Sequence, residues 1–491
     1  PAVAAATVSG HDGPGDGGVV VHGGRRCPVV TQTLKCERHG ETTRLTCVDC
    51  EQAICPKCMT RTEVGLKCER CAQPVASPDV ALGTRASRLP LVAGAVGLAL
   101  VAVVAFLALR PSGSPQQPVV ALPPVGTWTE APALAAIRGT ATAVVLDDGR
   151  VLAAGGGVGA IALDAAEIYD PSSQTWQQVA PLAQARRGHQ AVVLDDGRVL
   201  VAGGLANGVP LASAEVYDAG TDAWSPLAPM AIPRLGHSLT RLADGRVLAA
   251  GGSALESEGA AAGGQTIRTE ASTEIFDPDT GTWSPGGAMG TARFEHTATL
   301  LGDGRVLVVG GSGPTRDGEA VGPLASTELY DPAADVFVGS SDLTAARTNH
   351  AAALLNENAV IVSGGAGGDN GDVSLASAEV FDSRAAAWTT VGAMGTTRTG
   401  HSASVLDDGR VLVAGGETVR RGERRSLASG EVFDFDGGAS GEWRSAGDMA
   451  CPRSEHAAVV LGDASVLVVA GDAAFPGQAP APRSCVDRYQ P

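Results

Sequence analysis

Seven copies of one motif occupy the last three-quarters of this 491-residue chain. The clearest copy reads Arg187-Gly-His189, Leu194-Asp-Asp-Gly-Arg198-Val-Leu-Val-Ala-Gly203-Gly204, Glu215-Val-Tyr-Asp218 and Trp224. The seven units open at Arg138, Arg187, Arg234, Arg293, Arg347, Arg398 and Arg453. A motif that recurs about every 50 residues predicts an array of small sheets rather than one continuous core.

Each unit predicts four strands. Ala191–Leu194 and Val199–Ala202 are apolar runs joined by a tight turn, in which Asp-Gly supplies the positive backbone angles of a hairpin. A glycine doublet ends the second strand, where the backbone bends past a neighbour. A third strand carries Glu215–Asp218, and Trp224 opens the fourth.

Together the Arg-x-x-His, the glycine doublet, the acidic-apolar-aromatic-Asp stretch and the tryptophan resemble the kelch repeat, from Trp128 to the C-terminus. Departures are Thr140 in place of the first histidine, Phe337 in place of a tryptophan, and Gly471-Asp472 in place of a doublet. The resemblance implies a mainly β fold with a seven-bladed propeller over residues 127–491. Since Trp128 precedes the first unit and the seventh lacks a tryptophan, we expect Trp128–Ala131 to complete the last blade.

The repeated histidines invite a catalytic interpretation, but a residue that every blade shares is better explained by packing. We interpret the repeated arginines and glutamates in the same way, as pairs between strands or blades. These histidines are His189, His237, His296, His350, His401 and His456.

A copper centre like that of galactose oxidase, a seven-bladed kelch enzyme, would need tyrosines outside the repeat pattern. All four tyrosines fill the third-strand position, so we expect no copper-radical site. They are Tyr169, Tyr217, Tyr330 and Tyr489.

Stretches that differ between blades are the candidate binding surface, because loops on a rigid scaffold carry recognition. Four of them should emerge at one rim: Ser253–Ala271, Ser312–Ala325, Ala366–Ala378 and Glu417–Ala428. The last holds a basic island that is either a contact for an anionic partner or a solvated loop. Its arginines are Arg420, Arg421, Arg424 and Arg425.

Eight zinc ligands are predicted before the repeats, in a module over residues 35–72. Four pairs with two intervening residues suit two tetrahedral zinc ions, and an iron-sulfur cluster fits this spacing less well. Four protein ligands per ion leave no open position, so the zinc should be structural. The ligands are Cys36, His39, Cys47, Cys50, Cys55, Cys58, Cys68 and Cys71.

This spacing resembles the B-box zinc finger. The resemblance implies interleaved sites, with Cys36, His39, Cys55 and Cys58 on one zinc and Cys47, Cys50, Cys68 and Cys71 on the other. Many B-boxes have histidines where Cys68 and Cys71 stand, and Cys27 lies outside the pattern.

Residues 89–109 are apolar and close to the ~20 residues of a transmembrane helix. A cleaved signal peptide fits less well, because the segment is internal and no small-residue cleavage site follows it. Residues 1–34 lack periodicity and are predicted to be disordered, while 73–88 and the Pro-rich 110–126 read as linkers. Lys67, Arg70, Arg85 and Arg88 precede the span, so the N-terminus should be cytoplasmic and the propeller exported.

From Pro111 onward the chain has 24 arginines, no lysine and 44 acidic residues, a net charge of −20, which argues against nucleic acid as a partner. Cys451 and Cys485 would face an oxidising compartment, where they either pair or stay free.

We therefore expect a single-pass membrane protein with a propeller that binds a protein or glycan outside and a zinc finger that binds a protein inside. The alternative is an exported enzyme that uses the propeller as scaffold and acts on carbohydrate. Non-repeated acids and histidines gathered at one mouth of the ring would favour the enzyme, and the linear sequence shows no such cluster.

Overall fold

The structure is a computed structural model that describes residues 125–257, 265–314, 321–420, 422–435, 441–475 and 481–491, and four short strands nearer the N-terminus. The chain divides into two compact units, residues 1–116 and 117–491, which we describe separately.

In the first unit β1 (Leu34–Lys35) pairs with β2 (Thr42–Thr43), and β3 (Met59–Thr62) pairs with β4 (Gly65–Cys68), both antiparallel. Cys68 ends β4, and the other predicted zinc ligands lie outside the described residues. So do the predicted membrane span 89–109, the linker 73–88, residues 110–124 of the second linker and most of the segment 1–34. Over the part of the chain that the structure describes, no helix is long and apolar enough to cross a membrane.

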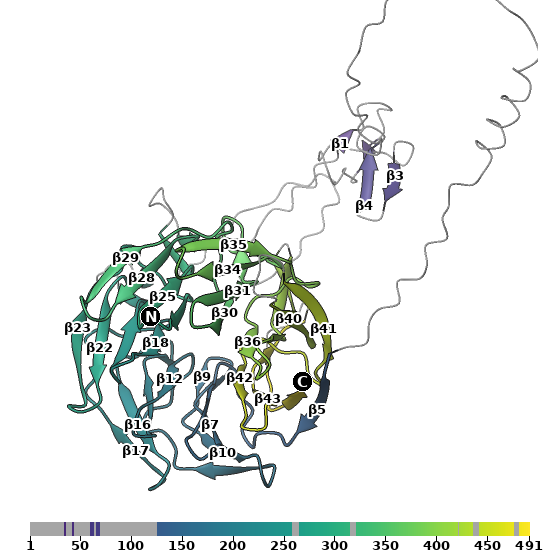
Figure 1. Ribbon diagram of the computed structural model, residues 1–491. Coiled ribbons are helices and arrows are strands. Elements are labelled where there is room, and N and C mark those ends of the chain that lie inside the picture. Colours follow the sequence, from purple (N-terminus) through teal and green to yellow (C-terminus); the bar gives the residue numbers. More distant parts are fainter. Residues whose placement is uncertain are drawn as a thin grey trace, which may run out of the picture. The chain divides into compact units, whose positions relative to one another are not determined.

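The second unit is a ring of seven four-stranded antiparallel sheets, the blades of a β-propeller (Figure 1). The first strands line the axis: β6 (Thr142–Val145), β12 (Gln190–Val193), β18 (Ser238–Arg241), β24 (Thr297–Leu300), β30 (Ala351–Asn356), β36 (Ser402–Val405) and β42 (Ala457–Val460). The second strands are β7 (Val151–Ala154), β13 (Val199–Ala202), β19 (Val247–Ala250), β25 (Val306–Val309), β31 (Ala359–Ser363), β37 (Val411–Ala414) and β43 (Val466–Val469).

The third strands are β10 (Ala166–Asp170), β16 (Ala214–Asp218), β22 (Thr273–Asp277), β28 (Thr327–Asp331), β34 (Ala378–Asp382), β40 (Ser429–Asp434) and β46 (Val486–Gln490). The outer strands are β11 (Thr175–Val179), β17 (Ala223–Pro226), β23 (Thr282–Gly286), β29 (Val336–Gly339), β35 (Ala387–Val391), β41 (Glu442–Asp448) and β5 (Thr127–Ala131).

The ring closes as the repeat count predicts. Strand β5 completes the last blade by pairing with β46, and Trp128 stands opposite Tyr489 in the register. Strand β42 of that blade contacts β6 of the first, as each inner strand contacts the next around the axis. Closure therefore joins the two ends of the repeat region and removes the free sides of the first and last blades.

The repeated turn holds its shape through an aspartate and an arginine. Asp196 accepts a hydrogen bond from the backbone N–H of Arg198 at 3.1 Å and pairs with its guanidinium at 2.6 Å. Gly197 has φ +80°, whereas Asp196 has an ordinary negative φ. The expectation that both residues supply positive angles is therefore wrong: the loop is the three-residue type, with only its glycine left-handed.

Aromatic pairs hold the outer half of each blade. Tyr217 on the third strand of the second blade lies 4.9 Å from Trp224 on the fourth, measured between ring centroids. Phe337 takes the tryptophan position in the fourth blade, 4.7 Å from Tyr330. The substitution keeps the contact, so Phe337 is a tolerated replacement.

Two departures from the repeat explain each other. The residue that corresponds to the repeated histidine in the first unit is Ala141, not Thr140, and the doublet of the seventh unit is Ala470-Gly471, not Gly471-Asp472. The evidence is that Gly471 donates to the carbonyl of Arg138, as Gly156 donates to that of Arg186. Elsewhere the first glycine faces the next blade's histidine: a Cβ on Gly155 would lie 2.7 Å from Cε1 of His189. Ala470 can carry a Cβ because the following blade offers Ala141 there.

We predict that Ala141→His destabilises the propeller (residues 117–491) by about 1–3 kcal/mol, because the imidazole would overlap the Cβ of Ala470. Adding Ala470→Gly should recover most of that loss, and Ala470→Gly alone should change stability little. Urea denaturation of the three variants measures this. Equal losses in the single and the double variant would contradict the pairing.

Candidate functional site

A buried arginine anchors every blade. The guanidinium of Arg347 donates to the carbonyl of Gly364 at 2.6 Å, to that of Ser377 at 3.0 Å and to Glu379 at 2.8 Å. Glu379 also accepts the backbone N–H of Thr344 at 2.8 Å. Arg347 and Glu379 are both fully buried. The expected arginine–glutamate pairs are therefore present, and each joins the incoming loop to the second and third strands.

The anchor of the second blade is Arg186 rather than Arg187, so the expected unit opening at Arg187 is wrong by one residue. Arg186 is buried and pairs with Glu215 at 2.8 Å. Arg187 is partly exposed and donates to the carbonyl of Gly159 at 2.7 Å. Because Arg186 and Arg187 are adjacent, the sequence alone did not show which of them opens the second unit.

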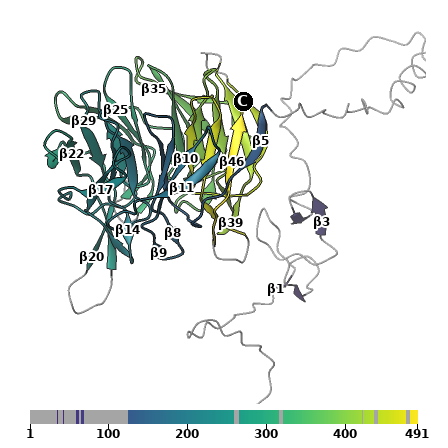
Figure 2. The ribbon, with the colours of Figure 1, turned by 90° about the horizontal axis from the view of Figure 1, so that it is seen from below.

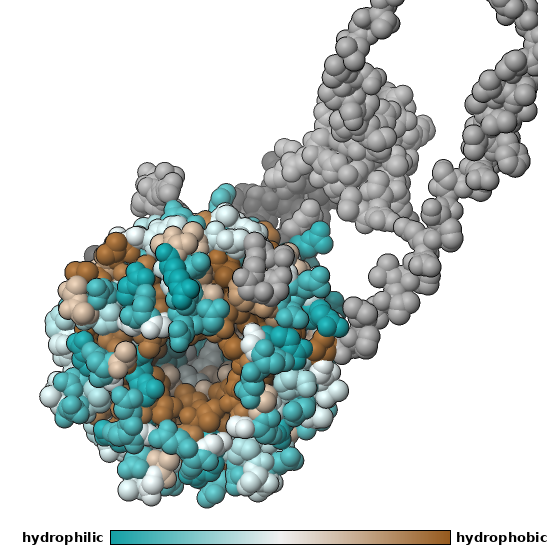
Figure 3. All heavy atoms as spheres, viewed as in Figure 1, coloured by the Kyte–Doolittle hydropathy of each residue, from teal (hydrophilic) through white to brown (hydrophobic). Residues whose placement is uncertain are grey.

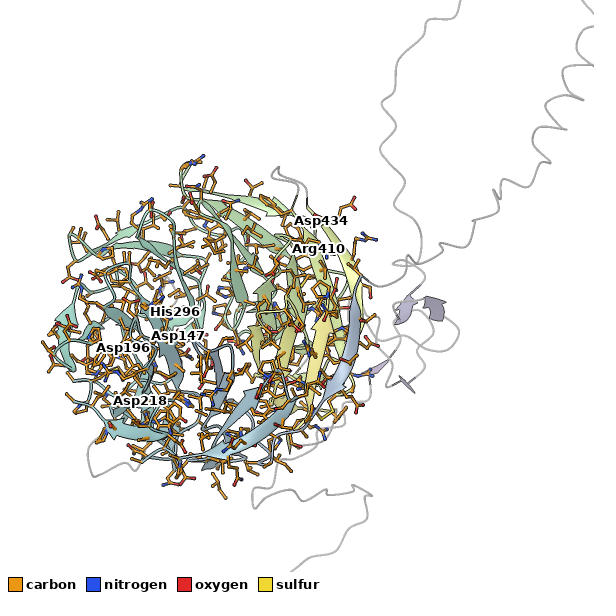
Figure 4. All side chains as sticks on the ribbon, turned by 60° about the horizontal axis from the view of Figure 1, so that its bottom comes forward. Asp147, Asp196, Asp218, His296, Arg410 and Asp434 are labelled. Carbon is orange, nitrogen blue, oxygen red and sulfur yellow. A yellow bond between two sulfur atoms is a disulfide. The ribbon has the colours of Figure 1, made fainter. Side chains whose placement is uncertain are left out.

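The repeated histidines connect neighbouring blades. Nε2 of His189 lies 2.9 Å from the hydroxyl of Thr142 in the preceding blade, and Nε2 of His456 lies 2.9 Å from that of Ser402. Burial lowers the pKa of His189 to about 3, so the ring is neutral at physiological pH. These contacts support the structural interpretation of the histidines. His296, labelled in Figure 4, likewise has its Nε2 3.0 Å from the hydroxyl of Ser238 in the preceding blade.

We predict that Arg347→Met lowers the unfolding free energy of the propeller by about 3–5 kcal/mol, because Glu379 is left buried and unpaired. The double variant R347M/E379L should lose less than R347M, since no charge remains. Chemical denaturation at neutral pH measures both. A loss below about 1 kcal/mol for R347M would contradict the anchoring role.

Seven residues form a narrow ring around the axis, each two positions after an anchor arginine. All have a left-handed backbone, and four successive N–H to carbonyl bonds between blades run from Glu295 to Gly236, at 2.7 Å, through to Glu455 to Gly400, at 2.9 Å; a fifth joins Gly188 to Thr140. This axial ring comprises Thr140, Gly188, Gly236, Glu295, Asn349, Gly400 and Glu455. A non-glycine residue in this conformation costs energy, so Thr140, Glu295, Asn349 and Glu455 stand out.

The axial ring borders a cavity of about 690 Å³, which is also lined by Leu235, Phe294 and several of the repeated histidines. The centre of the propeller is also hollow on the opposite face, which Figure 3 shows, with apolar residues around it. The volume lies within the range of ligand pockets, about 300–1,000 Å³.

Carboxylates converge where the axial ring borders the cavity, an opening that we call the axial mouth. Glu455 accepts a hydrogen bond from Nδ2 of Asn349 at 2.5 Å, and Glu295 accepts one from the hydroxyl of Thr348 at 3.3 Å. A Cβ on Gly400 would lie 2.5 Å from Oε1 of Glu455, so glycine there leaves room for the carboxylate. Glu455 is exposed to the cavity, but the protein that surrounds the axis reduces its contact with bulk water. This desolvation raises the pKa of Glu455 to about 7, and nearby Glu295, Glu417 and Asp472 add to the rise.

Sequence reasoning missed this cluster. Asn349 and Glu455 are 106 residues apart and meet only because the ring brings the blades together. One signal was available: the residue before each repeated histidine is glycine in three units and acidic in two, Glu295 and Glu455. An enzyme would be favoured by non-repeated acids and histidines together at one mouth of the ring. The histidines beside these acids belong to the repeat, so only the acids meet that criterion.

We predict a pH-dependent stability effect from Glu455. Its folded pKa of about 7 exceeds the ordinary glutamate value of 4.5, so the folded protein keeps a proton that the unfolded chain releases. The stability that this group contributes is complete below pH 4.5 and is lost as pH rises through 7. Glu455→Gln should therefore raise Tm relative to the parent at pH 8 and leave it nearly unchanged at pH 4.5, whereas Glu442→Gln, on the outer strand β41, should leave Tm nearly unchanged at both pH values. A pH-independent effect would contradict this assignment.

The variable stretches form two-stranded hairpins at one rim, as expected (Figure 2). We call these hairpins the crown. They are β8 (Gly157–Val158) with β9 (Ile161–Ala162), β14 (Leu205–Ala206) with β15 (Val209–Pro210), β20 (Ser253–Ser257) with β21 (Gln265–Thr269), β26 (Ser312–Pro314) with β27 (Val321–Pro323), β32 (Ala366–Gly367) with β33 (Val373–Ser374), β38 (Glu417–Arg420) with β39 (Glu423–Ser426), and β44 (Asp472–Ala473) with β45 (Ala481–Pro482). Leu205, at the start of its hairpin, bridges Arg187 beside the axial ring, so both features lie on one face.

The basic island lies on the crown hairpin of the sixth blade. Arg420 and Arg425 are exposed, Arg424 forms an ion pair with Glu417, and Arg421 lies outside the described residues. The pair uses one of the four arginines within the protein, and a contact with an anionic partner stays a prediction for the others.

In the closing blade Cys451 and Cys485 form a disulfide with their Cα atoms 6.5 Å apart. Within the described ranges no group of three or more His, Cys, Asp or Glu side chains is placed to hold a metal ion. The tyrosines lie on third strands as expected, and the hydroxyl of Tyr217 donates to Asp222 at 2.9 Å.

Three comparisons with known proteins agree with this architecture. The kelch motif profile matches residues 138–183 and 186–231. Kelch-like protein 34 from Homo sapiens is 35% identical over 133 residues, which cover 27% of this chain and 20% of that protein. A solved structure of a novel fungal alcohol oxidase of the AA5 family, in complex with copper, superposes with a TM-score of 0.57 at 17% identity, over 75% of this chain and 76% of that one.

The similarity to the oxidase is too distant in sequence to show more than the fold. The match to the human relative spans about a fifth of its length. Together with the seven closed blades, the comparisons establish that this chain carries kelch repeats folded into a seven-bladed β-propeller.

Proposed function

We propose that the propeller is a protein-recognition scaffold that binds its partner on the crown face. The observation that carries this proposal is that the repeated residues form the structural contacts, whereas the residues that differ between blades lie on the surface. The repeated arginines, glutamates and histidines are buried in contacts within and between blades. The crown and the axial ring vary from blade to blade, and kelch propellers in general bind proteins.

We further propose that the propeller is exported and anchored by residues 89–109, with the zinc module on the cytoplasmic side. The uncharged span and its positive N-terminal flank support this orientation. The disulfide between Cys451 and Cys485 also supports an oxidising compartment for the propeller. A glycan ligand rests on the same expectation of export, and residues 89–109 would contact the lipid bilayer.

An enzyme acting on carbohydrate is a second candidate, favoured by one observation. Glu295 and Glu455 are non-repeated acids at the axial mouth, and a glutamate with a pKa of about 7 suits general acid catalysis. Recognition is favoured over catalysis because Asn349 already engages Glu455 and no nucleophile with an activating base is evident among the described residues.

We predict that the exported propeller (residues 117–491), used as bait, retains a protein that chemical crosslinking places at the crown. Mass spectrometry of the retained material identifies it. We expect the parent protein not to turn over glycan substrates, so Glu455→Gln should have no such activity to remove. Retention of glycans alone, or turnover that Glu455→Gln abolishes, would favour the second candidate.

For the zinc module, we predict that a peptide of residues 25–75 binds two zinc ions and unfolds when they are chelated, because a domain of about 40 residues cannot bury enough core to fold unaided. Cys47→Ser should reduce the stoichiometry, and Cys27→Ser, outside the ligand pattern, is the matched control. Circular dichroism and metal analysis report both. A peptide that stays folded in chelator would sink the zinc proposal.

A further inference from the structure

We infer that the crown face docks a partner protein through a platform of exposed apolar tips, and that a lysine or arginine of the partner enters the axial mouth beside Glu295 and Glu455. This inference rests on the proposed recognition function and adds the chemistry of the partner.

The first observation is where apolar side chains are exposed. The described residues contain eight large hydrophobic side chains that are exposed, and five of them lie on the crown hairpins of the first, second, fourth and fifth blades. Ile161 is 65% exposed and Val209 57% exposed. Single exposed apolar residues are ordinary, but their concentration on one face marks an interaction surface. The five are Val158, Ile161, Val209, Val321 and Val373.

The second observation is that the crown hairpins support each other. Strand β9 contacts β14, β15 contacts β20, β33 contacts β38, β39 contacts β44, and β45 contacts β8. Hairpins that pack side by side on a rigid ring form a pre-organised platform, which lowers the ordering cost of binding.

The third observation is an excess of negative charge at the centre of this platform, which Arg424 offsets only in part by lowering the pKa of Glu295 through its charge. Glu417 forms an ion pair with Arg424, and Arg187 opposes the effect of burial on the pKa of Asp472. Glu295 and Glu455 have no ion pair within the described residues. Their hydrogen bonds to Thr348 and Asn349 come from neutral groups, so two carboxylates remain for a cation from outside.

The negative charge of the propeller favours a basic partner protein. The region from Pro111 onward carries a net charge of −20, so long-range attraction and the axial acids both favour a basic partner. Leu235 and Phe294 line the cavity next to the acids and can pack on the aliphatic stem of a lysine or arginine while its charged head reaches the carboxylates. A protein surface with one basic side chain among apolar residues could contact both the apolar tips of the crown hairpins and the carboxylates at the axial mouth.

The test uses the full chain, purified in detergent, and a phage-displayed library of random cyclic peptides as probe. Enriched peptides should combine a lysine or arginine with apolar neighbours. For a synthetic consensus peptide, calorimetry should show an affinity loss of about 30-fold or more in E295Q/E455Q, since a cation in a desolvated pair loses its partner. Val209→Ser with Val373→Ser should weaken the same peptide without changing the acids.

The control is E130Q/E442Q, which removes the same charge from exposed positions on the outer strands β5 and β41 and should leave binding nearly unchanged. Thermal melts verify that each variant is folded. Enriched peptides without a basic residue, or peptides equally weakened by the control, overturn the inference but leave protein recognition standing. If no peptide is enriched and the bait also retains no protein, the inference and the proposed function both fail.

Discussion

Seven buried guanidinium groups hold this propeller together. Each anchor arginine, such as Arg347, connects three parts of its blade: the carbonyls that end the second strand and precede the third, the carboxylate on the third strand, and through that carboxylate the loop that enters the blade. The carboxylate is a glutamate in six blades and Asp487 in the seventh. Such a group is costly to bury and is tolerated because almost every donor finds a partner. The hydrogen bonds of these arginines fix the positions of the strands, the glycine doublets and the axial ring.

Contacts between blades depend on this arrangement. The carbonyl of each anchor arginine accepts from the second glycine of the preceding doublet, as Gly365 donates to Arg398 at 2.8 Å. The histidine three residues later packs over the first glycine and bonds to a hydroxyl of the preceding blade in most units. The pair Ala141 and Ala470 shows how tight this joint is, because one missing imidazole is matched by one added methyl group. Since the shared residues have structural partners, recognition is left to the crown and the axial ring.

The number of blades and their closure could be predicted because repeats carry the same signal seven times, and Trp128 stood alone before the first unit. The register of the second unit could not, since Arg186 and Arg187 are both compatible with the spacing. The carboxylates at the axis could not be predicted for a different reason: Glu295 and Glu455 belong to separate blades, and only ring closure brings them to one cavity. The zinc ligands and the membrane span remain predictions from local spacing and composition.

In this structure the repeated residues form one closed, uniform ring, and variation is confined to the crown and the axial ring. Hydrogen–deuterium exchange of the propeller tests this most directly. The account predicts similar, strong protection of the second and third strands in all seven blades, including β46, whose outer partner β5 comes from the other end of the repeat region. The crown hairpins should exchange faster. Rapid exchange confined to β43 and β46, with protection elsewhere, would contradict closure of the ring.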